Sequence, residues 1–278
     1  MHDPRIFDPI AMEVFSNRLL SITEDMNNTL VRSSFSTNIK ERRDCSVGLF
    51  DGRGRLIAQG TQIPLHLGSL NGGVAAVLKA CPLGKMQDGD VFLCNDPYLA
   101  NGTHLPDISC VTPVFIEGKV EFFAANVGHH ADVGGAVPGS IAGGSRSIFE
   151  EGIRIPVVRI VRAGVLDIET LGLIAHNTRD PEERSLDLRV QVGNLGVGRL
   201  GRHDIHEFVL AMHCSPSGLS GCTMQQGASH SSGSVAPGLY TFITFAMPST
   251  ANIPAASAAR VMNSPRADCS SASNVEST

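Results

Sequence analysis

Two apolar runs joined by a short turn lie near the middle of the sequence: Ile108-Ser109-Cys110-Val111-Thr112-Pro113-Val114-Phe115-Ile116, then Glu117-Gly118-Lys119, then Val120-Glu121-Phe122-Phe123-Ala124-Ala125-Asn126. Two such runs separated by a Gly-containing turn predict a β-hairpin. Its strands would be antiparallel neighbours, so the residues just before the first strand lie beside those just after the second. The hairpin therefore predicts which residues meet, whatever surrounds it.

Polar side chains able to bind a metal gather in the two segments that flank this hairpin. Residues 102–107 (Gly-Thr-His-Leu-Pro-Asp) precede it, and residues 126–135 (Asn-Val-Gly-His-His-Ala-Asp-Val-Gly-Gly) follow it. The antiparallel pairing brings His104, Asp107 and His129 together. These ligands suit Zn, Mn, Fe or Co, and the absence of a nearby Cys pair argues against a closed structural zinc site. Two His and one carboxylate leave open positions, where a metal can polarise a carbonyl or activate a water.

Neighbouring polar residues extend this candidate site. Asp132, His130 and Asp96 are candidates for a further ligand, a partner of a ligand or a general base, and we expect Asp132 and His130 to manage protons. Asn95 and Asp96, in Asn95-Asp96-Pro97-Tyr98, are candidate substrate contacts. Each also has a structural interpretation, because a lone His beside a glycine turn is commonly a hydrogen-bonded residue and Asn-Asp-Pro is commonly a turn.

Two further residues are candidates for substrate binding. His66 precedes a predicted helix over residues 68–80, where it could line a pocket or be a half-buried loop residue. Arg43 follows Arg42 in a charged turn before a predicted strand, and these arginines could hold a substrate carboxylate. A charged turn of this kind is usually only solvated, so both interpretations stay open.

Elements on both sides of the central hairpin predict the fold class. Residues 45–50 and 55–59 predict a second hairpin, and residues 155–161 and 165–168 a third. The first helix, with Asp8 as N-cap and Pro9 as its first residue, has an apolar stripe. The stripe consists of Ile10, Val14, Leu19, Ile22, Met26 and Leu30. Further predicted elements are a short strand over 91–94, a Gly-rich loop over 134–144 and a helix from Pro181 towards Val192. Hairpins with helices before, between and after them indicate an α+β fold with a mixed or antiparallel sheet.

Charge and composition narrow the function classes. The chain has 22 Lys+Arg and 27 Asp+Glu, a formal charge of −5, which gives no support to a nucleic-acid partner. Residues 1–5 lack the layout of a secretory signal, and no apolar stretch is long enough to cross a bilayer, so we expect a cytoplasmic location and no membrane partner. The seven cysteines are scattered and never spaced Cys-x-x-Cys, which predicts buried, reduced thiols.

The composition changes after about Leu210. From residue 212 to 278 the charged residues are Arg260, Arg266, Asp268 and Glu276, and Ser, Ala, Gly and Pro dominate. Such a stretch offers little apolar surface to bury, so we expect residues 1–209 to form the folded part and residues 210–278 a low-complexity, disordered tail. A reading-frame change near the codons for residues 207–212 is the other explanation.

Nucleotide-binding motifs are poorly supported. Residues 196–201 (Gly-Val-Gly-Arg-Leu-Gly) have the dinucleotide spacing but follow a predicted helix rather than a strand, which favours a helix exit. The Gly-rich loop at 134–144 lacks the Lys-Ser/Thr ending of a phosphate-binding loop. The sequence therefore gives no support for ATP binding by this chain.

Several motifs, in the same order, resemble the N-terminal part of the hydantoinase B/5-oxoprolinase family. They lie at residues 36–44, 54–59, 64–69, 95–98, 102–107, 128–135, 150–156 and 177–184. The family includes B subunits of N-methylhydantoinases and 5-oxoprolinases and a related acetone carboxylase subunit. Its members are substantially longer, and the resemblance stops near Phe208.

This resemblance implies a division of labour between two subunits. A hydantoinase A-like partner would use ATP to phosphorylate a cyclic amide or a ketone, and the B subunit would complete hydrolysis or carboxylation. Carboxylase relatives hold a manganese-type metal with residues that look like His104, Asp107 and His129. The expected function is thus a subunit of a metal-dependent cyclic-amide hydrolase; the alternatives are an acetone carboxylase-like subunit or a non-catalytic remnant.

Overall fold

The computed structural model describes residues 9–61 and 63–200, and within them the predicted α+β class is confirmed. A seven-stranded sheet has the order β2-β1-β5-β4-β3-β6-β7, with every neighbouring pair antiparallel. The strands are β1 (Cys45–Asp51), β2 (Leu56–Gln59), β3 (Val91–Cys94), β4 (Asp107–Ile116), β5 (Lys119–His129), β6 (Val158–Arg162) and β7 (Val165–Leu166). The tail proposed for residues 210–278 lies outside the described residues.

The hairpin β4–β5 occupies the middle of this sheet. Glu117 and Gly118 form its two-residue turn with φ values of 48° and 78°. Positive φ at both central residues gives the turn a twist that matches that of the strands, and glycine adopts it without strain. The register pairs Ile116 with Lys119 at the turn and, at the far end, Asp107 with His129.

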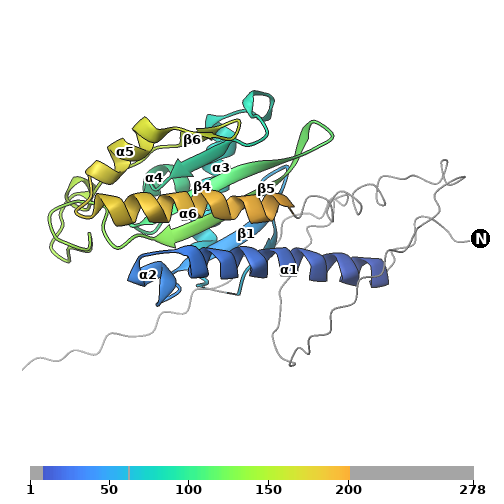
Figure 1. Cartoon of the computed structure of the whole chain (residues 1–278), viewed down its shortest axis with the longest axis horizontal. Helices are drawn as coiled ribbons and strands as arrows, with labels where there is room; N and C mark the ends of the chain where they lie inside the picture. The colour runs from blue at the N-terminus through green and yellow to red at the C-terminus, as the bar shows by residue number, and fades with distance from the viewer. Residues whose placement is uncertain (1–8, 62, 201–278) are drawn as a thin grey trace, which may run out of the picture. The chain divides into compact units, whose positions relative to one another are not determined.

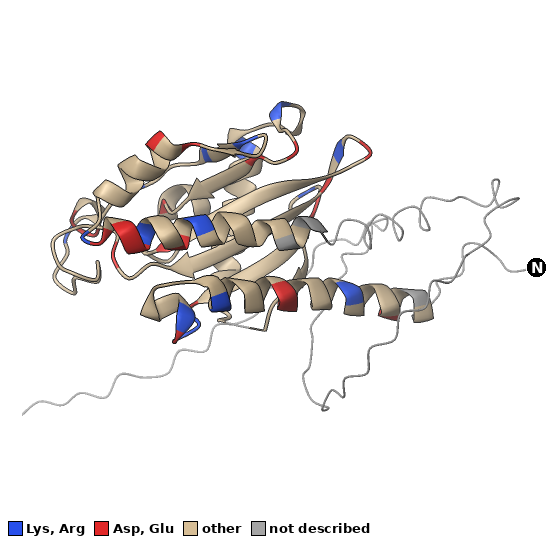
Figure 2. Ribbon diagram, in the orientation of Figure 1, with Lys and Arg blue, Asp and Glu red and all other residues tan. Residues whose placement is uncertain are grey.

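Helices cover both faces of the sheet. On one face α1 (Pro9–Ser33) and α6 (Pro181–Leu200) lie side by side, as Figure 1 shows. On the other face α3 (His66–Ala80) packs against β1, β4 and β5. Side chains alternate between these faces along a strand: Ala124 belongs to the core under α1 and α6, and Phe123 belongs to the core under α3. Because both faces are covered, the central strands carry very few charged residues, which lie mainly on helices and turns (Figure 2).

Short elements connect these layers. They are α2 (Thr37–Lys40), η1 (Leu83–Lys85), α4 (Pro97–Ala100), η2 (Ile148–Glu150) and α5 (Ile168–His176). Gly72 in α3 permits a close approach to α4, because a Cβ at this position would lie 1.9 Å from the carbonyl oxygen of Ala100. This contact helps to place the segment that follows α4, which carries His104.

Several details differ from the sequence predictions. Ile10 and Val14 are 73% and 51% exposed, since the first turns of α1 extend beyond the sheet, whereas the other four residues of the predicted stripe are buried. Ile168 begins α5 rather than ending a strand, because Asp167 caps this helix by accepting from the Glu169 and Thr170 amides. α6 continues past Val192 through Gly196 to Leu200, so it is longer than predicted, and Gly201 lies outside the described residues.

Two other sequence features can be followed in the structure. Among the described residues, Cys45, Cys81, Cys94 and Cys110 are buried, reduced thiols, as predicted for them. Burial raises the pKa of the Cys45 and Cys94 thiols to about 12, which keeps them protonated and unreactive. Within residues 9–61 and 63–200, no helix combines the length and apolar character needed to span a bilayer.

Candidate metal centre

His104, Asp107 and His129 meet at one end of the central hairpin. Asp107 is the first residue of β4 and His129 the last of β5, and the two are register partners. His104 Nε2 lies 3.3 Å from Asp107 Oδ1, and the rings of His104 and His129 are 4.8 Å apart between centroids. One ligand atom from each of the three residues lies within 4.8 Å of the others. The structure thus brings together the trio that the hairpin predicted.

The local backbone structure places the Asp107 carboxylate and the His104 ring beside each other. The Asp107 amide donates to the His104 carbonyl oxygen at 3.3 Å, which closes a tight turn, and the Thr103 hydroxyl donates to Asp107 Oδ2. Asn95 holds this turn in place: its Nδ2 donates to the carbonyl oxygens of Leu105 at 2.7 Å and Ile153 at 3.0 Å.

The electrostatics keep the carboxylate ionised. Burial works to raise the pKa of Asp107, but the adjacent His104 ring and the hydrogen bond from Thr103 outweigh it, and the pKa is lowered. The Asp107 carboxylate, 3.3 Å from its Nε2, raises the pKa of His104, whereas burial lowers that of His129. The negative carboxylate attracts a cation, and a metal bound here would have to displace the proton that Asp107 favours on His104.

A buried oxygen without a hydrogen bond indicates whether a metal would fit these residues. Asp107 Oδ1 is buried and has no hydrogen-bond partner in the described part of the chain. Leaving an ionised oxygen in this state costs free energy, and a cation bound between it and the two imidazoles would remove that cost. The His104 side chain is 34% exposed, which gives a ligand access from solvent. The donor set therefore fits a catalytic divalent metal such as Mn, Zn or Fe.

Asp44 and His66 border the trio. His66 Nε2 lies 3.5 Å from Asp44 Oδ1 and 3.7 Å from Asp107 Oδ1, and its Nδ1 contacts the Ser46 hydroxyl at 3.2 Å. His66, predicted to contact substrate, is thus a buried residue at the start of α3 beside the candidate metal ligands. Asp44, whose carbonyl oxygen accepts from the His129 amide at 2.9 Å, was not among the residues predicted from the sequence.

Asn38 in α2 contacts the outer nitrogen of His129. The Asn38 side-chain nitrogen lies 2.9 Å from His129 Nδ1. If the amide is turned so that its oxygen faces the ring, Nδ1 donates and Nε2 keeps its lone pair for a metal. Hydrogen bonds of this type orient metal-binding histidines in many proteins.

His130 lies on the opposite face of the sheet from His129, as alternation along an extended segment dictates. Its Nε2 donates to Gln191 Oε1 of α6 at 2.8 Å, since the Gln191 side-chain nitrogen is occupied by Ile108 O and Asn126 Oδ1. Burial lowers the pKa of His130 to about 4, so the ring is neutral. The structure does not bring His130 to the trio.

Asp132 anchors the glycine-rich loop. Its carboxylate accepts from the Gly134 and Gly139 amides at 2.8 and 3.0 Å and pairs with Arg179 Nη1 at 2.8 Å. Arg179 also donates to the carbonyl oxygens of Gly134 and Gly135. The pKa of Asp132 is lowered, because these hydrogen bonds outweigh the opposing effect of burial. Its oxygens are saturated, and the structure does not bring it to the trio either.

The remaining predicted residues have structural contacts. Besides its donor bonds, Asn95 accepts from the Ile155 amide at 2.7 Å. Asp96 caps α4 by accepting from Tyr98 N at 2.9 Å and pairs with Arg154 Nε at 3.1 Å. Arg43 is exposed and adopts a φ of 55° in the turn before β1.

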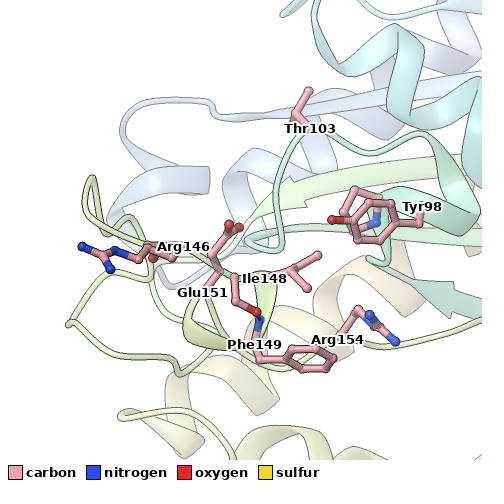
Figure 3. Close-up of a pocket in the computed structure, with 10 residues that line it drawn as sticks. Tyr98, Thr103, Arg146, Ile148, Phe149, Glu151 and Arg154 are labelled. Atoms are coloured by element: carbon pink, nitrogen blue, oxygen red, sulfur yellow. Dashed lines mark hydrogen bonds between the residues drawn. The ribbon is translucent and has the colours of Figure 1, made fainter.

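A pocket adjoins the trio through Thr103. It has a volume of about 720 Å³ and is lined by Pro97, Tyr98, Thr103, Ser145, Arg146, Ser147, Ile148, Phe149, Glu151 and Arg154. In Figure 3, Tyr98 and Thr103 form one wall and the segment from Arg146 to Arg154 forms the other. The charge of Glu151 is one of the influences that raise the pKa of His104, so this carboxylate acts on the trio. Sequence analysis did not single out Glu151 or Arg154, because nothing in the sequence places residues 145–154 opposite Tyr98.

The fold and site together define a class: α+β proteins with a candidate open metal centre at the end of a central hairpin. Residues 8–209 match the model of the family described as Hydantoinase B/oxoprolinase, and the chain belongs to this family. The resemblance in the sequence motifs is thereby confirmed.

Three relatives illustrate the family. A 5-oxoprolinase of Dictyostelium discoideum is 42% identical over 186 residues, which cover 66% of this chain and 14% of the relative. The caprolactamase subunit beta of Pseudomonas jessenii is 34% identical over 192 residues, which cover 69% of this chain and 32% of that subunit. The crystal structure of the ATP-dependent caprolactamase of that organism superposes with a TM-score of 0.67 at 31% identity, covering 76% of this chain and 35% of that one.

An acetone carboxylase structure, solved for a study of ATP-dependent acetone carboxylation, superposes with a TM-score of 0.66. It is 23% identical and covers 74% of this chain and 27% of that chain, so the likeness concerns the fold. The chain spans only about a seventh to a third of the length of these relatives.

Proposed function

We propose that this chain is a subunit of an ATP-dependent cyclic-amide hydrolase that uses a divalent metal in ring opening. The observation that carries the proposal is the buried Asp107 Oδ1, which accepts no hydrogen bond within the described residues and lies among the ligand atoms of His104 and His129. Two relatives support the substrate class, since 5-oxoproline and caprolactam are both cyclic amides.

His104, Asp107 and His129 would hold the metal, which when bound supplies Lewis-acid polarisation of a carbonyl oxygen. Thr103 restrains the Asp107 carboxylate through Oδ2 and leaves Oδ1 directed at the trio. Asn38 fixes the ring of His129, and His66 stays buried beside both carboxylates. Glu151 lines the pocket that adjoins the trio through Thr103, and we propose it, in place of Asp132 and His130, as the residue that accepts or returns a proton during ring opening.

ATP would be used by a hydantoinase A-like partner subunit. Relatives support a complex, because one is named as a subunit beta and two solved structures come from ATP-dependent enzymes. The acetone carboxylase likeness favours a second candidate, a carboxylase subunit acting on a ketone, at the level of the fold alone.

Ring opening by the assembled complex tests the proposal. The chain is co-purified with its A-like partner, and hydrolysis of 5-oxoproline is followed with ATP and Mn²⁺. We expect ATP-dependent product formation that His104→Ala abolishes and that His176→Ala, a change at an exposed histidine in α5, leaves intact. Turnover of a ketone that requires bicarbonate would instead favour the carboxylase. A folded complex with neither metal nor turnover would indicate a non-catalytic remnant.

A further inference from the structure

The pocket beside the candidate metal centre has the properties of a small-molecule site. Its volume of about 720 Å³ falls within the range of roughly 300–1,000 Å³ typical of such sites. Ile148 and Phe149 give it apolar surface, and Tyr98, Ser145 and Arg154 give it polar groups.

Arg154 is held in a fixed position at this pocket. Its Nε pairs with Asp96 Oδ2 at 3.1 Å, and its guanidinium carbon lies 5.2 Å from the centre of the Phe149 ring. Nη1 and Nη2 make no hydrogen bond to any residue of the described ranges, and 40% of the side chain is exposed. A guanidinium fixed through one nitrogen and one face keeps a planar pair of donors for an oxyanion, and carboxylates match that geometry.

The charges of the pocket differ from one side to the other. Thr103 lies on the wall next to Asp107, while Arg154 lies on the facing wall (Figure 3). Glu151 also lines the pocket, and its negative charge would repel an anion bound beside it. A substrate with both a carbonyl and a carboxylate would therefore bind with the carbonyl towards the trio and the carboxylate towards Arg154.

We propose that Arg154 is a specificity-determining residue that binds a substrate carboxylate, so that the preferred substrates are small cyclic amides bearing a carboxylate. This inference rests on the proposed function and narrows its substrate class. It distinguishes an acid such as 5-oxoproline from neutral compounds such as caprolactam or a simple ketone.

Two ligands that differ only in the carboxylate test the inference. 5-Oxoproline and 2-pyrrolidinone share the same five-membered lactam ring. Each is titrated calorimetrically into the full 278-residue chain with Mn²⁺ present and without ATP or partner. We expect 5-oxoproline to bind about 10- to 100-fold more tightly, as expected for charge-assisted hydrogen bonds. Arg154→Gln should bring this ratio close to one, and Arg154→Lys should retain part of it, because a lysine keeps the charge but not the fork.

Arg146→Gln is the matched control. Arg146 also lines the pocket but extends away from Tyr98 and Thr103 in Figure 3, so this change should leave the ratio near its original value. Circular dichroism checks that each variant is folded. Equal affinities for both ligands in the wild type, no binding of either, or a ratio that survives Arg154→Gln would each overturn the inference.

The binding assay separates this inference from the proposed function. ATP-dependent ring opening without a preference for the acid would overturn the inference and leave the function standing. A carboxylate preference lost in Arg154→Gln, in a complex that opens no ring, would support the recognition and overturn the hydrolase.

Discussion

Asp107 and Asp132 flank the same hairpin, yet the fold treats their carboxylates differently. Asp132 accepts from two backbone amides and pairs with Arg179, so both of its oxygens are bonded within the chain. Asp107 has Oδ2 bonded to Thr103, while the buried Oδ1 has no hydrogen-bond partner within residues 9–61 and 63–200. Buried acceptors are nearly always satisfied in proteins. The comparison therefore indicates that Asp132 holds a loop in place, whereas Asp107 needs a ligand to complete its bonding.

The largest expected effect follows from removing the saturated carboxylate. Asp132→Ala leaves Arg179 and two backbone amides without their acceptor, and we expect the free energy of unfolding to fall by about 3 kcal/mol. In chelator-treated protein, Asp107→Ala should cost less, because Oδ1 has no hydrogen bond to lose. Urea denaturation of the three proteins measures both differences. A larger loss for Asp107→Ala would contradict the structural contrast.

For metal affinity, in contrast to stability, a change at Asp107 should have a larger effect than a change at Asp132. Asp107→Asn removes the negative charge between His104 and His129, so we expect Mn²⁺ to bind at least about 100-fold more weakly, since mutations in the outer sphere alone cost about 10–100-fold. Asp132→Asn should change the affinity by less than about threefold because Asp132 is not brought to the trio. Competition with a fluorescent chelator gives both affinities. Equal losses in the two variants would show that the trio is not the binding site.

The sequence predicted the parts of this site whose contacts are fixed within the central hairpin. The hairpin turn at Glu117 and Gly118 fixes the register between β4 and β5, and that register alone brings Asp107 to His129. This pairing of Asp107 with His129 does not depend on the rest of the fold. Asp132 and His130 are close in sequence to His129, but proximity along the chain says nothing about which face a side chain occupies.

Non-local contacts explain what the sequence did not predict. Asp44 reaches the trio because β1 pairs with β5, with Cys45 opposite Gly128. Nothing in either strand's sequence specifies that pairing, since apolar strands can pair with many partners. Arg154 likewise acquires its position from Asp96, which caps α4, a helix of four residues with no periodicity to read. The division at residues 209 and 210 stays a prediction.

Metal affinity at the Asp107 site and stability at the Asp132 site should change over different pH ranges. This is the smallest of the expected effects, but the two responses are easily separated. A metal competes with protons for histidine, so Mn²⁺ affinity should fall about tenfold per pH unit once the pH drops below the raised pKa of His104. The pKa of Asp132 is instead lowered in the folded state, below its unfolded value of about 3.9. Its contribution to stability is therefore complete above that value and is lost only as the pH falls through the lowered pKa.

The difference in unfolding free energy between wild type and Asp132→Asn should therefore be constant from pH 8 to pH 5 and shrink only below about pH 4. Chelator competition and urea denaturation at the same series of pH values measure the two responses side by side. If the stability difference already closed between pH 7 and pH 5, a histidine would have to take part in the Asp132 contacts. The contrast between a saturated carboxylate and one that awaits a cation would then no longer hold.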